Sequence, residues 1–154
     1  MFGRDLKKYV NHEASMAKLL PKHPNICACQ RVFETQDYVY IVMEFCGSTS
    51  VSQLHESVGA TEEQAKNYLR QMIKAELAMK TVNIYNLDIK KENMMINDQG
   101  VLKIIDFGLI SFDDLEYKEH SHDVRWSSMS YEWAHKRPYT PSSIISWRNA
   151  VAIY

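Results

Sequence analysis

Three polar side chains, Asp88, Asn93 and Asp106, have the types and the spacing to handle a metal ion and a phosphate group. A four-residue loop, Asn97–Gly100, is predicted to join two short strands, and this loop length places Asn93 opposite Ile104. Asp106 lies two residues further along the chain, which makes it a diagonal neighbour of Asn93, about 7–8 Å away at Cα.

An Asp carboxylate and an Asn amide oxygen at this separation are able to share Mg²⁺, which takes few protein ligands and keeps phosphate oxygens and water. Asp88 precedes Asn93 by five residues and adds a second carboxylate beside the pair. Two carboxylates and an amide in this arrangement suit phosphoryl transfer, in which catalysis consists mostly of positioning and charge neutralisation.

Amphipathic helices and two hairpins must position these residues. Apolar side chains at spacings of three and four predict helices, while runs of β-branched and aromatic residues predict strands. Thr61 and Gln64 form a capping box, which marks the start of the clearest helix. Helices are predicted over residues 5–20, 51–57, 61–82 and 142–154, and strands over residues 26–33, 38–45, 94–96 and 101–105. Residues 83–92 are predicted to be a polar loop, and residues 106–140 show no sustained periodicity.

Composition excludes several classes of protein. The 154 residues carry 18 Lys and Arg against 19 Asp and Glu, which leaves no basic surface for nucleic acid or for a membrane. No apolar run is long enough to span a membrane, and the first residues are too polar for a signal peptide. Cys27, Cys29 and Cys46 contain no C-x-x-C pair, so neither a disulfide framework nor a structural zinc site is predicted. We therefore expect an intracellular, cytoplasmic protein.

An ordered series of motifs resembles the catalytic domain of eukaryotic protein kinases. Asp88–Asn93 resembles the catalytic loop of that family, and Asp106–Gly108 resembles its D-F-G motif. The flanking segments follow in the family's order, with Glu13 near the αC glutamate, His23–Ile26 at the αC–β4 turn, Tyr40–Cys46 at the hinge, Ser130–Trp133 at A-P-E and Ser146–Trp147 at αF. Lys90 is typical of serine/threonine kinases, and the subgroup resembles PIM-like or sterile-20-like enzymes.

The resemblance implies ATP and Mg²⁺ as cofactors, and a protein substrate or a partner kinase as the binding partner. Asp88 is then the base that accepts the proton of the substrate hydroxyl, and Lys90 steadies the transferred phosphate. The implied site residues are catalytic (Asp88, Lys90), metal-binding (Asn93, Asp106) and ATP-binding (Glu13, Met43, Glu44, Cys46).

The fold implied is a partial α+β protein-kinase fold, mainly the helical C-lobe with a β-hairpin remnant of the N-lobe. We expect one truncated kinase-like domain over residues 1–154, from the αC region to the start of αF. Several motifs are eroded: H-R-D reads Asn86-Leu87-Asp88, and Ile145 stands where αF normally has the aspartate that braces the catalytic loop.

Three interpretations are compatible with these motifs. The first is a serine/threonine kinase domain, which we expect to be weakly active or inactive as 154 residues alone. The second is a pseudokinase or decoy that binds a complete kinase or its regulator. The third is a non-functional gene fragment.

Overall fold

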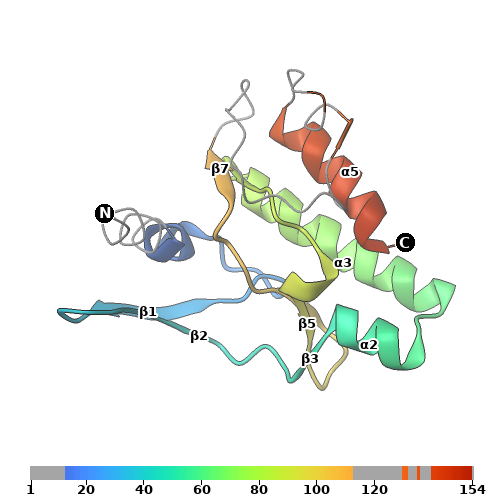
Figure 1. Ribbon diagram of the computed structural model, residues 1–154, viewed down its shortest axis with the longest axis horizontal. Helices are drawn as coiled ribbons and strands as arrows, with labels where there is room; N and C mark the ends of the chain where they lie inside the picture. Colours follow the sequence, from blue (N-terminus) through green and yellow to red (C-terminus); the bar gives the residue numbers. More distant parts are fainter. Residues whose placement is uncertain (1–12, 113–129, 132–134, 136–139, 154) are drawn as a thin grey trace.

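The computed structural model describes residues 13–112, 130–131, 135 and 140–153, and combines helices with small antiparallel sheets (Figure 1). A helical segment covers residues 13–19, within the predicted helix 5–20. The other elements are β1 (Cys29–Glu34), β2 (Val39–Met43), β3 (Thr49–Ser50), α2 (Val51–Val58), α3 (Glu62–Lys80), β4 (Ile84–Asn86), η1 (Lys91–Asn93), β5 (Met94–Ile96), β6 (Leu102–Ile104), β7 (Ile110–Phe112) and α5 (Pro141–Ile153). The predicted α+β class is confirmed.

The strands form three small sheets, with orders β1–β2, β3–β5–β6 and β4–β7. In Figure 1 the β1–β2 hairpin projects away from the helices α3 and α5. Helix α3 packs against β4 and β6, and α5 contacts both α3 and β4. Among the described residues, no helix is long and apolar enough to cross a membrane.

Helices α2 and α3 each begin with a side-chain cap. Thr61 accepts a hydrogen bond from the backbone N–H of Gln64, and the Gln64 side chain accepts one from the backbone N–H of Thr61, which confirms the predicted capping box of α3. Ser50 and Gln53 make the same reciprocal pair at the start of α2. Helix α3 ends at Lys80, two residues before the predicted end.

Asn25 joins the segment before the hairpin to the rest of the core. Its buried side-chain amide donates to the carbonyl of Leu102 and to Oε1 of Gln71, both at 2.8 Å. Its own carbonyl accepts from the N–H of Ile104 at 3.0 Å, and Ile26 forms a parallel bridge with Ile104. The predicted strand from residue 26 therefore pairs first with β6, and β1 begins only at Cys29.

The β5–β6 register differs from the prediction by one residue. Ile96 pairs with Leu102 and not with Val101, because the Asn97 side chain accepts from the N–H groups of Gln99 and Val101 and so includes Val101 in the turn. Gly100 completes this turn at a φ of 73°. Asn93 therefore lies beside Ile105 and not opposite Ile104, as the N–H of Ile105 donates to the Asn93 carbonyl at 3.0 Å.

The expected polar loop over residues 83–92 contains a strand. Residues Ile84–Asn86 are buried and form β4, which pairs antiparallel with β7. This pairing brings the segment before Asp88 against the segment after Asp106. The acid-rich stretch 113–123 and residues 5–12 of the first predicted helix lie outside the described residues.

Candidate active site

Asp88, Lys90 and Asn93 come together in the loop between β4 and β5. The Asn93 side-chain amide donates to the Asp88 carbonyl oxygen at 3.1 Å and to Asp88 Oδ2 at 2.9 Å. The Lys90 ammonium group donates to the same Oδ2. The loop thus holds a carboxylate, a cation and an amide in direct contact.

Asn86 links this loop to Asp106. Its side chain is fully buried, accepts from the N–H of Asp88 at 2.8 Å and donates to the Asp106 carbonyl at 2.9 Å. Asp106 in turn uses Oδ1 to accept from the N–H of Gly108 at 2.9 Å. One buried amide therefore joins the two motifs in addition to the β4–β7 pairing, a role that its place in an eroded H-R-D did not predict.

Arg148 of α5 braces the loop from the other side. Its guanidinium group donates to the carbonyl of Leu87, and Nη1 lies 3.5 Å from Asp88 Oδ1. The Arg148 side chain is buried, whereas that of Asp88 is 17% exposed. The family resemblance places the αF brace at Ile145, which cannot make such a contact. The bracing contact comes instead from Arg148, three positions later, which the sequence analysis did not predict. The signal in the sequence was an arginine, Arg148, within an otherwise apolar helical pattern.

Asn93 and Asp106 offer oxygen donors that suit Mg²⁺. Because the Asn93 amide nitrogen points to Asp88, its Oδ1 is the atom able to bind a cation, and Asp106 Oδ2 is the second such oxygen. Hard oxygen donors of these two kinds are the ligands that Mg²⁺ prefers, so the residues present fit the ion.

Glu13 lies on the first described helical segment, within electrostatic reach of Asp106. Burial, together with the negative charge of Asp106, raises the pKa of the Glu13 carboxyl. Two acidic groups that repel each other in this way favour a cation between or beside them. Glu13 and Asp106, a predicted metal-binding residue, therefore interact electrostatically.

Met43, Glu44 and Cys46 follow one another at the end of β2, and Met43 and Glu44 are half-buried while Cys46 is buried. The backbone N–H of Glu44 donates to the Ala28 carbonyl at 2.9 Å. Oε1 of the Glu44 side chain accepts from the Ala28 N–H and from the Lys103 ammonium group, both at 2.7 Å. Burial favours the neutral acid, but these bonds outweigh it and lower the pKa of Glu44. Lys103 is a partner of this segment that sequence patterns did not indicate.

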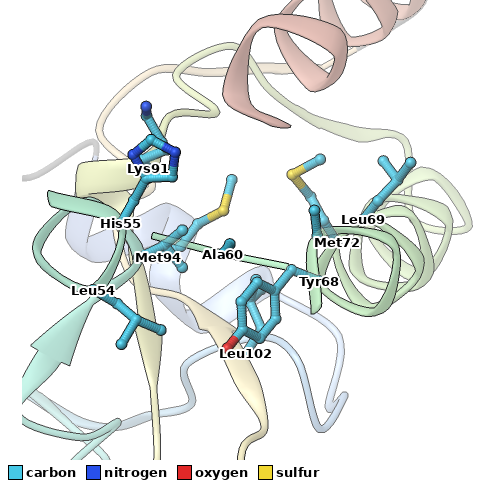
Figure 2. Close-up of a pocket in the computed structure, with 11 residues that line it drawn as sticks. Leu54, His55, Ala60, Tyr68, Leu69, Met72, Lys91, Met94 and Leu102 are labelled. Carbon is cyan, nitrogen blue, oxygen red and sulfur yellow. The ribbon is translucent and has the colours of Figure 1, made fainter. Parts of the chain in front are cut away.

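A small apolar cavity of about 40 Å³ lies between α2, α3 and the β5–β6 hairpin (Figure 2). Met72, Met94 and Leu102 line it together with side chains of α2, and Lys91 adds a polar group. None of the predicted site residues lines this cavity, which is therefore separate from the Asp88 cluster.

Comparison with known proteins gives one family. The model of the protein kinase domain matches residues 3–150. The chain is 31% identical over 103 residues to the human hormonally up-regulated neu tumor-associated kinase. The aligned region covers 66% of this chain and 14% of the relative. It is 31% identical over 113 residues to the CBL-interacting serine/threonine-protein kinase 9 of Arabidopsis thaliana, covering 73% of this chain and 25% of the relative.

A third relative, the sperm motility kinase 2B of Mus musculus, is 30% identical over 137 residues, covering 88% of this chain and 28% of the relative. The chain thus spans between 14% and 28% of the length of these three curated relatives. None of the three names is that of a PIM-like or sterile-20-like kinase, and the subgroup stays a prediction.

Proposed function

Since the chain belongs to the protein kinase family, we propose that its Asp88 cluster serves ATP- and Mg²⁺-dependent phosphoryl transfer to a protein serine or threonine hydroxyl. The observation that carries this proposal is the hydrogen-bonded set of Asp88, Lys90 and Asn93, joined to Asp106 through Asn86. Phosphoryl transfer needs a positioned acceptor for the hydroxyl proton and fixed positive charge near the phosphate. In this proposal Asp88 is the proton acceptor and Lys90 carries the positive charge.

Each residue has a separate part in this proposal. Asp88 orients the substrate hydroxyl and accepts its proton, while Lys90, already bonded to Asp88, carries positive charge at the same point. Asn93 and Asp106 would hold Mg²⁺ through Oδ1 and Oδ2, and the ion would neutralise charge on the phosphate oxygens.

The nucleotide is proposed to bind along the segment that ends β2. Met43 bounds the site, and the backbone of Cys46 offers polar groups to the adenine ring, because the backbone N–H and carbonyl of Glu44 already bond to Ala28, Cys27 and Cys46. Glu44 is anchored by Ala28 and Lys103, which keeps this backbone in place. Glu13 is proposed to attract the cation that accompanies the phosphates, because it and Asp106 repel each other without one.

A second function, nucleotide or partner binding without transfer, is favoured by the surroundings of Asp88. Both of its carboxylate oxygens face a cation, Lys90 at Oδ2 and Arg148 at Oδ1. A substrate hydroxyl would have to compete with both cations for a hydrogen bond to Asp88, which agrees with the expected weak activity of the 154 residues alone. A pseudokinase would need only the nucleotide site or a docking surface.

Nucleotide binding is tested first, by thermal melts of the chain with and without Mg-ATP. At a ligand concentration one hundred times Kd we expect stabilisation of about 2.7 kcal/mol. Asp106→Asn should lose this stabilisation, whereas Asp98→Asn, a change in the exposed turn before Gly100, should keep it. A cooperative melt that ignores Mg-ATP in the unchanged chain would contradict the proposal.

Transfer is tested next, with labelled ATP and a mixture of serine and threonine peptides. We expect Asp88→Asn to lower the rate by about 10²–10⁴-fold while the stabilisation by Mg-ATP remains. Stabilisation without any transfer by the unchanged chain would replace the kinase proposal with the binding module.

A further inference from the structure

Two cysteines and a glutamate meet where the segment after β2 passes the segment before β1. The sulfur atoms of Cys27 and Cys46 and a carboxylate oxygen of Glu44 all lie within 4.8 Å of one another. Both cysteines are buried, with exposed fractions of 2% and 5%. The spacing of these residues along the chain did not predict such a cluster.

The three side chains are held in place by the backbone around them. Cys27 and Cys46 each donate from the thiol to the Glu44 carbonyl, with both sulfur–oxygen distances at 3.6 Å. Glu44 and Cys46 are two residues apart in a segment without helix, so their side chains are able to share one side of it. Contact of two thiols with one oxygen defines a single point at which they converge.

The Glu44 carboxylate is fixed at the same point. Its Oε1 accepts from Ala28 N–H and from the Lys103 ammonium group, both at 2.7 Å. Its Oε2 is the oxygen able to bind a cation. The neighbouring Lys103 side chain is only 13% exposed, so its positive charge acts on the cluster with little screening by water.

We propose that Cys27, Cys46 and Glu44 bind a thiophilic divalent ion such as Zn²⁺, with water as the fourth ligand. Sulfur ligands select Zn²⁺ over Mg²⁺, which separates this site from Asn93 and Asp106. Two thiolates, one carboxylate, the ion and Lys103 together sum to zero charge. Tetrahedral Zn²⁺ with Zn–S bonds of about 2.3 Å needs its ligand atoms roughly 4 Å apart, so they must close by about 1 Å at most.

Binding must release protons. Each thiol gives up its proton as the sulfur–zinc bond forms, so one Zn²⁺ and two thiols yield two Zn–S bonds and two protons. Protons compete with the ion for both sulfur atoms, because only the thiolate binds the metal. Metal uptake is therefore expected to strengthen as the pH rises. The site requires no nucleotide, although Glu44 and Cys46 also belong to the segment proposed to bind adenine, and metal uptake is therefore measured without nucleotide.

The experiment uses the untagged chain under a phosphine reductant, titrated with Zn²⁺ in weak buffer and with Co²⁺ as a spectroscopic probe. We expect one ion per chain, two protons released for each Zn²⁺, and a sulfur-to-cobalt charge-transfer band. Cys27→Ser and Cys46→Ser should weaken Zn²⁺ binding by more than about tenfold. Cys29→Ser is the matched control, because the Cys29 thiol bonds to the Arg31 carbonyl outside the cluster.

Proton release and the cobalt band are measured on the unchanged chain, so the test survives even if a cysteine variant fails to fold. Absence of both signals would overturn the proposal. Zn²⁺ binding that persists in Cys27→Ser and Cys46→Ser would also overturn it. A mass decrease of two hydrogens without reductant, together with no metal uptake, would identify the pair as a dithiol that oxidises to a disulfide.

Discussion

Arg148 of α5 donates to the carbonyl of Leu87, the residue directly before Asp88, across 61 positions of the sequence. The same guanidinium group lies 3.5 Å from Asp88 Oδ1. A helix late in the chain thus holds both the backbone and the side chain of the candidate base.

Arg148→Met should destabilise the chain by about 2–3 kcal/mol, because it leaves the Leu87 carbonyl and the Asp88 carboxylate without this donor. Urea denaturation measures the loss. Arg70→Met changes an exposed arginine on α3 and should stay within about 0.5 kcal/mol of the parent. Equal stability of the two variants would show that Arg148 is not a brace.

Asn86→Ala should cost about 2–4 kcal/mol and should abolish stabilisation by Mg-ATP, since both side-chain hydrogen bonds of Asn86, to the Asp88 N–H and to the Asp106 carbonyl, are lost. Asn97→Ala is the matched control. It also removes two side-chain hydrogen bonds, but from the β5–β6 turn. We expect its melts to retain the response to Mg-ATP; a lost response in both variants would mean that Asn86 has no special role.

Glu76 of α3 predicts a pH dependence of stability. Burial raises its pKa to about 7, although Asn149 donates to Oε2 at 2.7 Å, and Oε1 is buried with no hydrogen-bond partner in the described part of the chain. The folded chain therefore holds this proton more tightly than the unfolded chain, whose Glu pKa is near 4.5. The Glu76 contribution to stability is present below pH 4.5 and is lost as the pH rises to about 7.

Glu76→Gln should remove this loss and stabilise the chain by up to about 3 kcal/mol above pH 7, with little effect near pH 4. Urea melts across this pH range measure it. Glu63→Gln, at an exposed position in the first turn of α3, should leave the pH profile unchanged. A parallel profile for Glu76→Gln and the parent would refute the assignment.

Gly47→Ala should be far more damaging than Gly59→Ala. Gly47 has a φ of 116°, and a Cβ there would lie 2.3 Å from the Ile96 carbonyl oxygen. Gly59 has a φ of 75°, with open space where a Cβ would lie. We expect losses of about 2–4 kcal/mol for Gly47→Ala and about 1–2 kcal/mol for Gly59→Ala, read from thermal melts. Similar losses would show that the close approach to Ile96 has no cost.

Local signals in the sequence predicted the elements well. The Thr61 cap located α3 to the residue at its start, because a capping box depends only on four neighbouring residues. The hairpin register was wrong by one, because Asn97 closes its turn through its own side chain and loop length alone does not reveal that. Strand β4 was missed because Ile84-Tyr85-Asn86 is too short to show a period and is buried by distant elements, β7, α3 and α5.

The candidate site was predictable to the extent that it is local. Asp88, Lys90 and Asn93 lie within six residues, and the structure brings them into contact. Partners supplied by distant elements were not predictable from one sequence. Lys103 reaches Glu44 across 59 positions, and Arg148 reaches Leu87 across 61. The arginine within an apolar helical pattern marks Arg148 as unusual, but no residue type near Arg148 or Lys103 identifies its partner.

The bonds of Asn25 bear on the order in which the chain assembles. Its amide meets the Leu102 carbonyl across 77 positions, so that contact has to wait until a long loop closes. The capped helices α2 and α3 lie inside that loop and form from neighbouring residues, which is the faster kind of event. We therefore expect the helices to precede the docking of the β1–β2 hairpin during folding. Hydrogen exchange of the Ile104 amide would then report the final step.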